Sequence, residues 1–125
     1  MQDAVKKFTR DEIIPKASHH DQTMKFPWDI IKKAHANGFM NVDIPTEYGL
    51  ISRKIFTKIL IILGGLDMDL VSNVLISEAI GYGCTGMGTA ILGNDLAATP
   101  LILCGSDEVK KKFLTRLIEE PLMAV

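Results

Sequence analysis

The glycines of GYGCTG, residues 81–86, have the GxGxxG spacing of a loop that holds the phosphates of a dinucleotide, and Asp107 follows about 20 residues later. A loop of that kind needs a buried strand before it and a helix after it. The preceding segment VSNVLISEAI instead places Asn73, Ser77 and Glu78 at helical rather than strand spacing. We therefore predict a turn between two helices, with nucleotide binding as the weaker alternative.

Three neighbouring side chains, His19, His20 and Asp21, are of types that bind metal ions. A protein metal site needs three or four converging ligands, and His35 is the only other histidine in the sequence. We therefore interpret the three as a solvated helix end and predict no metal site. The sequence also offers no Ser/His/Asp or Cys/His arrangement for nucleophilic catalysis, so we predict no catalytic residue.

Lysines are grouped at residues 6–7, 32–33 and 110–112, where they could contact an acidic ligand. Each group lies on an expected helix with acids nearby, which favours a solvated helix face. The whole chain has 14 basic and 15 acidic residues and a net charge of −1. No broad electrostatic attraction to nucleic acid is expected from that balance.

The elements that position these residues belong to one domain, because 125 residues is an ordinary domain length. With 47% hydrophobic and 23% charged residues, the chain can build a globular core. Cys84 and Cys104 form no CxxC pair and suit a reducing compartment. No secretory signal opens the chain. The most apolar run, residues 55–63, is shorter than the roughly 20 residues of a membrane helix, so we expect a soluble protein without membrane contact.

Apolar residues at helical spacing predict helices and almost nothing else, and hence an all-α bundle of about five helices. The first helix starts at Gln2 and runs up to Pro15. The second has Pro27 at its first position and ends at Gly38, a glycine placed to terminate a helix. The expected apolar faces of these two helices are Ala4, Val5 and Phe8, and Trp28, Ile31 and Ala34. The segment NVDIPTEYG is predicted to be a loop.

The third helix, near residues 67–83, repeats apolar residues at positions 70, 71, 74, 75 and 79. The fourth, residues 87–103, has no polar face, which predicts burial on most sides, and is interrupted by Pro100. Ser106 is the expected cap of the fifth helix. The apolar stripe of that last helix is Val109, Phe113 and Leu117.

Longer strings of residues are more informative than these patterns. The strings DEIIP, FPWDIIKKAHANGFMNVDIPTEYG, ISEAIGYGCTG, TAILGN and DEVKKKFLTRLIEEPLMA resemble the N-terminal helical domain of acyl-CoA dehydrogenases, most closely the medium-chain type. They occur in the family's order and at its spacing, over residues 2–49 and 65–125. Residues 1–125 are therefore interpreted as one such domain, ending before the family's middle β-domain and containing a non-family insert at 50–64.

The resemblance implies an FAD-dependent enzyme of fatty acid β-oxidation that desaturates medium-chain fatty acyl-CoA between its α and β carbons. In this family a glutamate base removes the α proton while the flavin N5 takes the β hydride. Electrons then pass to an electron-transfer flavoprotein, usually in the mitochondrial matrix. The complete enzymes are homotetramers whose subunits combine a helical domain, a middle β-domain and a C-terminal four-helix domain.

The match to the family's TAIxGN helix implies that Thr89, Leu92, Gly93 and Leu96 contact the fatty chain of the substrate. Gly93 would leave room for the chain, while Leu92 and Leu96 supply apolar wall. Medium-chain relatives often carry a glutamate where this sequence has Leu92, and a leucine makes the base of the pocket drier. Chain-length preference therefore does not follow from the resemblance. Simple core packing is the alternative explanation for the same four residues.

The family continues past EEPLMA with a segment like YCVTEPGAGSD that contacts the flavin, and its base glutamate lies in the C-terminal domain. The resemblance therefore assigns no cofactor-binding residue to this chain, which also has no transit peptide before the matched region. We expect the 125 residues alone to be inactive. A free-standing helical interaction module without catalysis is the alternative function.

Residues 50–64 interrupt the resemblance. Deleting them joins IPTEYG to GLDMDL, as family members read. The block is rich in Ile, Leu, Lys and Phe, which AT-rich codons favour, and we hypothesise an unspliced intron or a gene-model error. Its apolar run also has an aggregation-prone composition. The alternative is an extra amphipathic helix that binds a membrane or a partner through Ile55, Ile59, Ile62 and Leu63.

Overall fold

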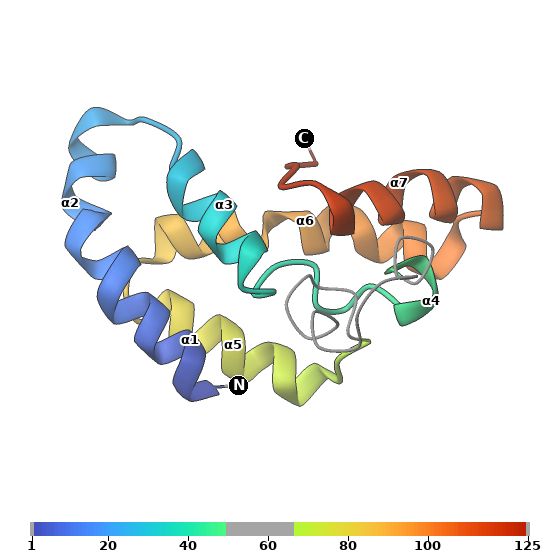
Figure 1. Ribbon diagram of the computed structural model, residues 1–125, viewed down its shortest axis with the longest axis horizontal. Helices are drawn as coiled ribbons and strands as arrows, with labels where there is room; N and C mark the ends of the chain where they lie inside the picture. Colours follow the sequence, from blue (N-terminus) through green and yellow to red (C-terminus); the bar gives the residue numbers. More distant parts are fainter. Residues whose placement is uncertain (1, 50–66, 125) are drawn as a thin grey trace.

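The computed structural model describes residues 2–49 and 67–124, and every element in these ranges is helical (Figure 1). The elements are α1 (Gln2–Phe8), the π-helical turn η1 (Thr9–Ile13), α2 (Ile14–Thr23), α3 (Trp28–Ala36), α4 (Thr46–Gly49), α5 (Leu70–Gly81), α6 (Thr85–Cys104) and α7 (Asp107–Glu119). Because α1, η1 and α2 follow one another without a break, the described residues form five longer helices and the single turn α4. The predicted all-α bundle is confirmed.

Helix α6 is the element around which the others gather (Figure 1). It packs against α5, α7 and α3, while α1 packs on α5 and α4 on α7. The turn between α5 and α6 is only three residues long, so the two helices diverge from a shared corner. This corner determines where a groove between them can form.

The first helix does not end at Pro15, as the sequence suggested, but continues to Thr23. Pro15 lies inside this continuous helix, directly after the π-helical turn η1, and the irregular turn accommodates a residue that has no N–H. The chain enters that turn through η1, in which the Ile14 N–H bonds to the Thr9 carbonyl five residues back. The Thr9 hydroxyl donates to the Ala79 carbonyl at 2.9 Å, which fastens this π-helical turn onto α5.

Two hydrophobic clusters lie on either side of buried polar residues. The larger gathers α1, η1, α3, α5 and the first half of α6, and the smaller gathers α7, Ile44 and Ala98. On α6, Asn94 follows Ile91 of the larger cluster by three residues and precedes Ala98 of the smaller by four. Asn41, fully buried, occupies the matching place on the segment after α3.

The predicted termini of the helices are largely confirmed. Gly38 has φ 70°, and the Phe39 N–H bonds back to the Ala34 carbonyl at 3.0 Å, so α3 ends as expected. Ser106 accepts from the Val109 N–H and caps α7. The segment predicted as a loop contains α4, a single turn held in part by the Thr115 hydroxyl, which donates to the Tyr48 carbonyl.

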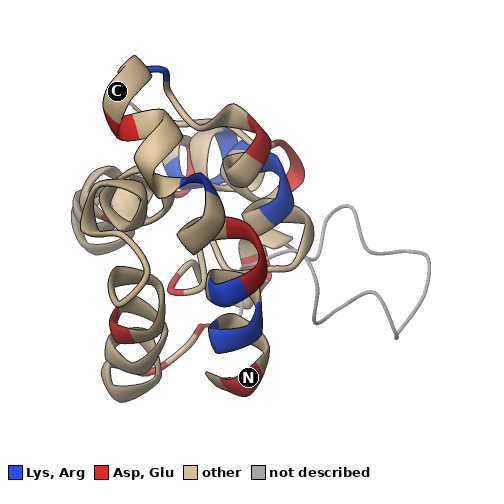
Figure 2. Cartoon of the chain, turned by 90° about the vertical axis from the view of Figure 1, so that its left-hand side faces the viewer, with Lys and Arg blue, Asp and Glu red and all other residues tan. Residues whose placement is uncertain are grey.

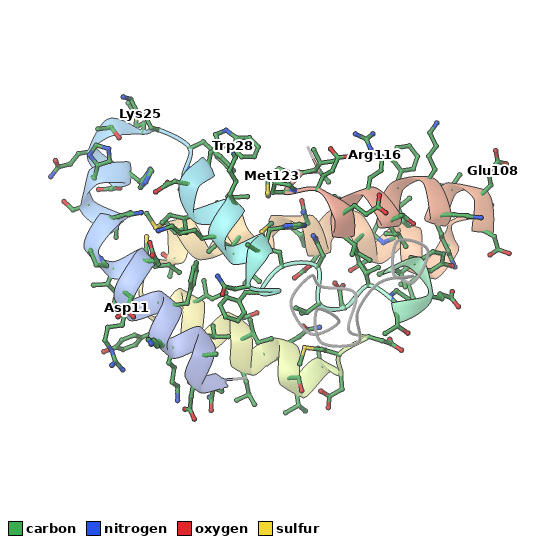
Figure 3. All side chains as sticks on the ribbon, in the orientation of Figure 1. Asp11, Lys25, Trp28, Glu108, Arg116 and Met123 are labelled. Atoms are coloured by element: carbon green, nitrogen blue, oxygen red, sulfur yellow. The ribbon has the colours of Figure 1, made fainter. Side chains whose placement is uncertain are left out.

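The predicted apolar faces are wrong in several places, because pattern alone does not say which face meets the core. On α5 the buried residues are Ile76, Ala79 and Ile80, whereas Leu70, Val71, Val74 and Leu75 are exposed. On α7 the core is made by Leu114, Leu117 and Ile118, while Phe113 is exposed. Ala4 and Trp28 are exposed as well, and the Trp28 side chain stands at the outer edge of the domain (Figure 3).

The prediction that the fourth helix is buried on most sides is also wrong. Helix α6 buries one face, through Met87, Gly88, Ile91, Asn94 and Ala98. Leu96 and Leu103 are 81% and 73% exposed, and Pro100 lies within the helix rather than ending it. By length and composition α6 could cross a membrane. That is weak evidence for a single helix, because helices of soluble domains pass the same test, so the absence of membrane contact stays a prediction.

Charged residues follow one another along the helix that starts at the end marked N (Figure 2). Lys33 bonds to Glu12 at 2.6 Å and Lys16 bonds to Asp29 at 2.7 Å, which links α3 to η1 and α2. These contacts are largely exposed, consistent with the solvated faces predicted for the lysine groups. The insert at 50–64 and its alternative as an amphipathic helix lie outside the described residues.

Candidate functional site

A groove of about 460 Å³ runs along α5 and α6 from their shared corner. We name it the α5–α6 groove; its lining is Ser77, Gly81, Thr85, Gly88, Thr89, Leu92, Gly93, Asp95 and Leu96. Leucines, glycines and short hydroxyl side chains dominate this lining, and it contains no lysine or arginine. Such a surface suits an apolar chain better than a phosphate.

All four residues that the sequence singled out lie in this groove. The Thr89 hydroxyl donates to the Thr85 carbonyl at 3.0 Å, so its methyl group is free to face an apolar ligand. Leu92 is half-buried against the larger core cluster, and Leu96 is 81% exposed. A Cβ added to Gly93 would meet only the Met123 Cε at 3.8 Å, an ordinary contact distance. Core packing therefore accounts in part for Leu92 but not for Leu96.

The GYGCTG segment is a turn between two helices, as predicted, and its glycines serve different purposes. A Cβ on Gly83 would lie 2.5 Å from the Thr9 Cγ2, so this glycine permits the close approach of the turn to η1. A Cβ on Gly81 would meet nothing within 4 Å. In the described structure the turn follows a helix rather than a strand and packs on η1, so the dinucleotide interpretation fails.

A pair of carboxyl groups lies at the end of the groove that is farther from the corner. Burial, the charge of Asp43 and a hydrogen bond to Asp43 together raise the pKa of Asp95 to about 7. Burial also raises the pKa of Asp43 above its ordinary value. Within the described residues, Asp43 Oδ1 is buried and has no hydrogen-bond partner. The raised pKa favours a protonated Asp95 carboxyl group below about pH 7.

Beside this pair, a network of buried amides holds α6 in place. Asn94 Nδ2 donates to Asn41 Oδ1 at 3.0 Å and to the Leu122 carbonyl at 2.9 Å. Asn94 Oδ1 accepts from the Ala124 N–H at 2.8 Å. Asn41 Nδ2 in turn donates to the Leu117 carbonyl at 2.7 Å. We name Asn41 and Asn94 the amide hub; it fixes the rotation of α6, and hence which residues of α6 face the groove.

Two further hollows are formed by the described residues. One, of about 540 Å³, lies between η1 and α5 and has Lys6, Arg10 and Tyr82 in its wall. The other, of about 440 Å³, lies beneath the segment after α2 and has His20 and Cys84 in its wall. The second hollow shares Thr89 with the α5–α6 groove, whereas Leu92, Gly93 and Leu96 line neither hollow.

The histidines do not converge. His20 lies near Asp29 on the surface, whereas His35 is buried on α3 with its Nε2 bonded to the Ile118 carbonyl. The described ranges hold no group of three or more His, Cys, Asp or Glu side chains arranged around a common point.

The fold class and the site together define an α-helical domain that presents an apolar groove. The sequence profile of the acyl-CoA dehydrogenase N-terminal domain matches residues 1–63 and 62–121. The chain therefore belongs to the acyl-CoA dehydrogenase family, as its N-terminal domain.

Individual relatives agree with this family. The chain is 38% identical over 124 residues to a probable mitochondrial medium-chain specific acyl-CoA dehydrogenase of Caenorhabditis briggsae. The alignment covers 99% of this chain and 27% of that protein. It is 33% identical over 118 residues to a probable acyl-CoA dehydrogenase of Bacillus subtilis, covering 94% and 27%. It is 34% identical over 112 residues to a 3-(aryl)acrylate reductase of Clostridium sporogenes, covering 89% and 26%. The chain thus spans about a quarter of the length of these relatives.

The family implies FAD, but neither the GYGCTG turn nor the α5–α6 groove fits its pyrophosphate. A flavin dinucleotide carries a pyrophosphate, which calls for backbone N–H groups of a glycine-rich turn or for basic side chains. Gly83 in the only candidate turn of the described chain is occupied by contacts with η1, and the α5–α6 groove contains no basic residue. The α5–α6 groove therefore suits an apolar chain better than the flavin pyrophosphate, and the basic residues Lys6 and Arg10 lie in a separate hollow between η1 and α5.

Sequence reasoning missed Asp43 and Asp95. A usable signal existed, because Asp95 is the only charged residue between Thr85 and Cys104 and lies three residues after Leu92. Its partner could not be found from the sequence, since Asp43 is brought to it only by the packing of the segment after α3 on α6.

Proposed function

We propose that this chain supplies one wall of the acyl-chain pocket of an FAD-dependent acyl-CoA dehydrogenase. The observation that carries the proposal is that Thr89, Leu92, Gly93 and Leu96 line one groove. The resemblance of TAILGN to the family's helix points to the same four residues. The substrate is proposed to be a fatty acyl-CoA, whose hydrocarbon chain lies along α6.

The groove offers a physical reason to bind such a chain. Leu96 exposes most of its side chain to water, and Leu92 exposes part of its surface. Covering apolar surface of this kind gains about 0.8 kcal/mol for each methylene group that leaves water. Because the residues at positions 81, 88 and 93 are glycines without side chains, a hydrocarbon chain can approach the backbone of the groove closely.

The chain is proposed to contribute binding rather than chemistry. In the complete enzyme, desaturation between the α and β carbons needs a carboxylate base and a flavin, and we propose that both are held by parts of the protein outside this domain. The medium-chain preference, an electron-transfer flavoprotein as electron acceptor and a homotetrameric assembly are part of the same proposal. Location in the mitochondrial matrix is also proposed: the relative from Caenorhabditis briggsae is mitochondrial by name, while other relatives are bacterial.

The binding proposal is tested on the full chain by following its leucine methyl groups by NMR during titration with octanoyl-CoA. The methyl signals of Leu92 and Leu96 are expected to shift together and to saturate. The variant Leu96→Asp should weaken binding at least about tenfold, because it places a charge against the hydrocarbon. Leu103→Asp is the matched control, since it changes another exposed leucine of the same helix outside the groove. Equal binding by both variants would contradict the proposal.

Catalytic inactivity of the isolated chain is tested separately. The purified chain is mixed with FAD and octanoyl-CoA, and the visible spectrum is recorded. We expect the spectrum of free FAD, unchanged by the thioester. A protein-bound flavin band that bleaches on addition of octanoyl-CoA would overturn this part of the proposal.

A free-standing helical interaction module is the second candidate, favoured by the exposed apolar side chains on α5. Leu70, Val71, Val74 and Leu75 are 79%, 65%, 57% and 38% exposed. A contiguous apolar face of this kind marks a contact surface. Analytical ultracentrifugation separates the two candidates: a stable, soluble monomer favours the module, and aggregation favours a domain separated from its neighbours.

Residues 50–64 are proposed to be absent from the functional protein, as an unspliced intron or gene-model error. The family profile matches in two segments, 1–63 and 62–121, so the match is interrupted near the end of the block although its first segment includes residues 50–63. Sequencing of the mature transcript tests the idea, which fails if the dominant message encodes the block. In that case the amphipathic-helix alternative becomes the working explanation.

A further inference from the structure

We propose that the hollow between η1 and α5 is a second binding site, which takes a small aromatic carboxylate. In this site Arg10 and Lys6 hold the carboxylate group, while Tyr82 and Ile14 contact the ring. The hollow has a volume of about 540 Å³, within the range of ligand pockets in proteins. It is separate from the α5–α6 groove, so its ligand is independent of the fatty acyl chain proposed for the groove.

The floor of the hollow is apolar and already assembled. Helices α1 and α5 pack side by side, and η1 continues this contact (Figure 1). The Thr9 hydroxyl donates to the Ala79 carbonyl at 2.9 Å, so these two polar groups of the floor satisfy each other. A Cβ on Gly83 would lie 2.5 Å from the Thr9 Cγ2, which shows how closely the α5–α6 turn approaches η1. A ligand therefore does not have to bring the walls together, and π-helical turns such as η1 often occur at functional sites.

Two basic side chains in the wall of the hollow can hold an anion. Lys6 and Arg10 are four residues apart on the continuous helix of α1 and η1, and both line the hollow. Within the described part of the chain, neither of them forms an ion pair. Like charges at this spacing on a helix destabilise each other, so an anion bound between them is favoured. Arginine in particular presents two parallel N–H donors that match the two oxygens of a carboxylate.

A third charged side chain, Glu78, restricts the charge of the ligand. It is exposed on α5 and lines the same hollow. The two basic side chains and this one acid give the hollow a net charge of +1. A carboxylate carries one negative charge and balances this value. A phosphate monoester carries a charge of about −1.5 to −2 at neutral pH, so Glu78 repels it more strongly.

The uncharged part of the wall suits an aromatic ring. Tyr82 is 85% exposed, and its ring forms no aromatic pair and no cation–π pair with the described residues. Ile14 is 45% exposed. A planar ring can stack on the tyrosine and cover the isoleucine, and it loses less conformational entropy on binding than a flexible chain does. An aromatic carboxylate thus uses the basic and the apolar parts of the wall together.

The probe for the experiment is 2-naphthoate, which joins one carboxylate to a rigid aromatic ring. Its binding to the full chain at pH 7 is followed by NMR through the methyl signals of Ile14 and the ring signals of Tyr82. We expect these signals to shift together and to saturate. Four related compounds should bind more weakly: acetate lacks the ring, 2-naphthylmethanol lacks the charge, octanoate lacks the rigid ring and 2-naphthyl phosphate carries too much charge.

Variants of exposed residues test each part of the wall, and circular dichroism checks that they stay folded. Arg10→Gln should weaken the binding of 2-naphthoate at least about tenfold, because it removes charge-assisted hydrogen bonds. Tyr82→Ala should weaken it about fivefold through the loss of stacking. Glu78→Gln should strengthen the binding of 2-naphthyl phosphate at least about threefold by removing a repulsion. Lys7→Gln is the matched control for charge and should change nothing, since Lys7 is exposed on the same helix but lies outside the hollow.

The outcomes separate this site from the function proposed for the groove. If 2-naphthoate causes no saturable shift of Ile14 and Tyr82, or shifts Leu92 and Leu96 instead, the inference is overturned and the binding of an acyl chain in the groove is unaffected. Equal losses in Arg10→Gln and Lys7→Gln would show that the attraction is non-specific and would also overturn it. Octanoate or 2-naphthyl phosphate that binds as tightly as 2-naphthoate, or a Glu78→Gln variant with unchanged affinity for the phosphate, would reject the assigned class of ligand.

Discussion

Polar residues are usually exposed and apolar residues buried, but the amide hub and one face of α5 show the reverse. We call the exposed apolar residues Leu70, Val71, Val74 and Leu75 the outer face of α5. Asn41 and Asn94 are 2% and 0% exposed, yet both are polar. Leu70 and Val71 are 79% and 65% exposed, yet both are apolar. The hub is stable in the interior because its hydrogen bonds are made within the domain. The α5 face has no covering partner among the described residues, so its apolar groups are available for contacts that the domain does not itself provide.

The comparison separates residues that determine the internal packing of the domain from residues that are available to bind a ligand or a partner. The hub bonds α6 to the segment after α3 and to the residues after α7, so it determines the domain's internal geometry. The exposed apolar residues of α5 and α6 contribute little to that geometry. Substitutions in the two regions should therefore have opposite consequences: large changes in stability for the first, and changes in binding or association for the second.

The largest effect is expected for Asn94→Ala. The change leaves Asn41 Oδ1, the Leu122 carbonyl and the Ala124 N–H without their partner. Buried polar groups that lose a partner cost about 1–3 kcal/mol each, so the free energy of unfolding should fall by about 4 kcal/mol. Urea unfolding followed by circular dichroism measures it.

The control for that substitution is Asn37→Ala, which removes an exposed hydrogen bond to the Lys33 carbonyl. Water replaces this bond, so the loss should stay below about 1 kcal/mol. If both variants lose a similar amount of unfolding free energy, the buried hydrogen bonds of the hub contribute no more to stability than an exposed one.

A matched pair of neighbours on α5 tests the two faces directly. Ile76 is 2% exposed and Leu75 is 38% exposed. Ile76→Ala should lower the free energy of unfolding by about 3 kcal/mol through a cavity in the larger core cluster. Leu75→Ala should lower it by less than about 1 kcal/mol, because no cavity forms. If Leu75→Ala costs as much as Ile76→Ala in the same urea titration, the outer face is already covered within this chain.

Two glycines at the α5–α6 corner test the difference between a tightly packed and an open position. In Gly83→Ala the new Cβ would lie 2.5 Å from the Thr9 Cγ2, and the resulting overpacking should cost about 2 kcal/mol. In Gly81→Ala the Cβ meets nothing within 4 Å, and helix propensity should raise stability by up to about 1 kcal/mol. Thermal unfolding measures both, and a change of the same sign in the two variants would contradict the assigned geometry.

The smallest effect is the pH dependence of stability. Because the pKa of Asp95 is about 7 in the folded chain and 3.8 is its ordinary value, the folded state binds the proton more tightly. Stability is therefore greatest below the ordinary value and falls as pH rises towards 7. Between pH 5.5 and pH 8 we expect a loss of about 1 kcal/mol, after allowing for solvent around the pair.

Asp95→Asn should remove most of this pH dependence. Asp69 does not mask it, since hydrogen bonds from the Ser72 side chain and then from the Ser72 N–H lower the pKa of Asp69, and its contribution is lost only in acid. Urea midpoints at the two pH values provide the measurement. If the stability of Asp95→Asn falls with pH as steeply as that of the unmodified chain, groups other than Asp95 cause the pH dependence.

Much of the fold could be predicted from local signals. The capping serine at 106, the terminating glycine at 38 and the helical spacing of apolar residues depend on interactions within a few residues, which sequence reports well. The candidate site residues could also be selected, because the TAILGN string resembles a family pattern. Asp43 could not, since its role depends on a partner 52 positions away, at Asp95.

The sequence by itself determined the all-α class, the order of the helices and the family, because these depend on periodicity, caps and contiguous strings of residues. Only the tertiary structure decided which face of α5 and α6 is buried, that the first helix continues through Pro15, and that two acids meet at the groove. The physical reason is that an apolar helix has more than one face able to pack. Contacts between distant segments, such as the Thr9 hydroxyl with the Ala79 carbonyl and Asn94 with Asn41, select the face that is used.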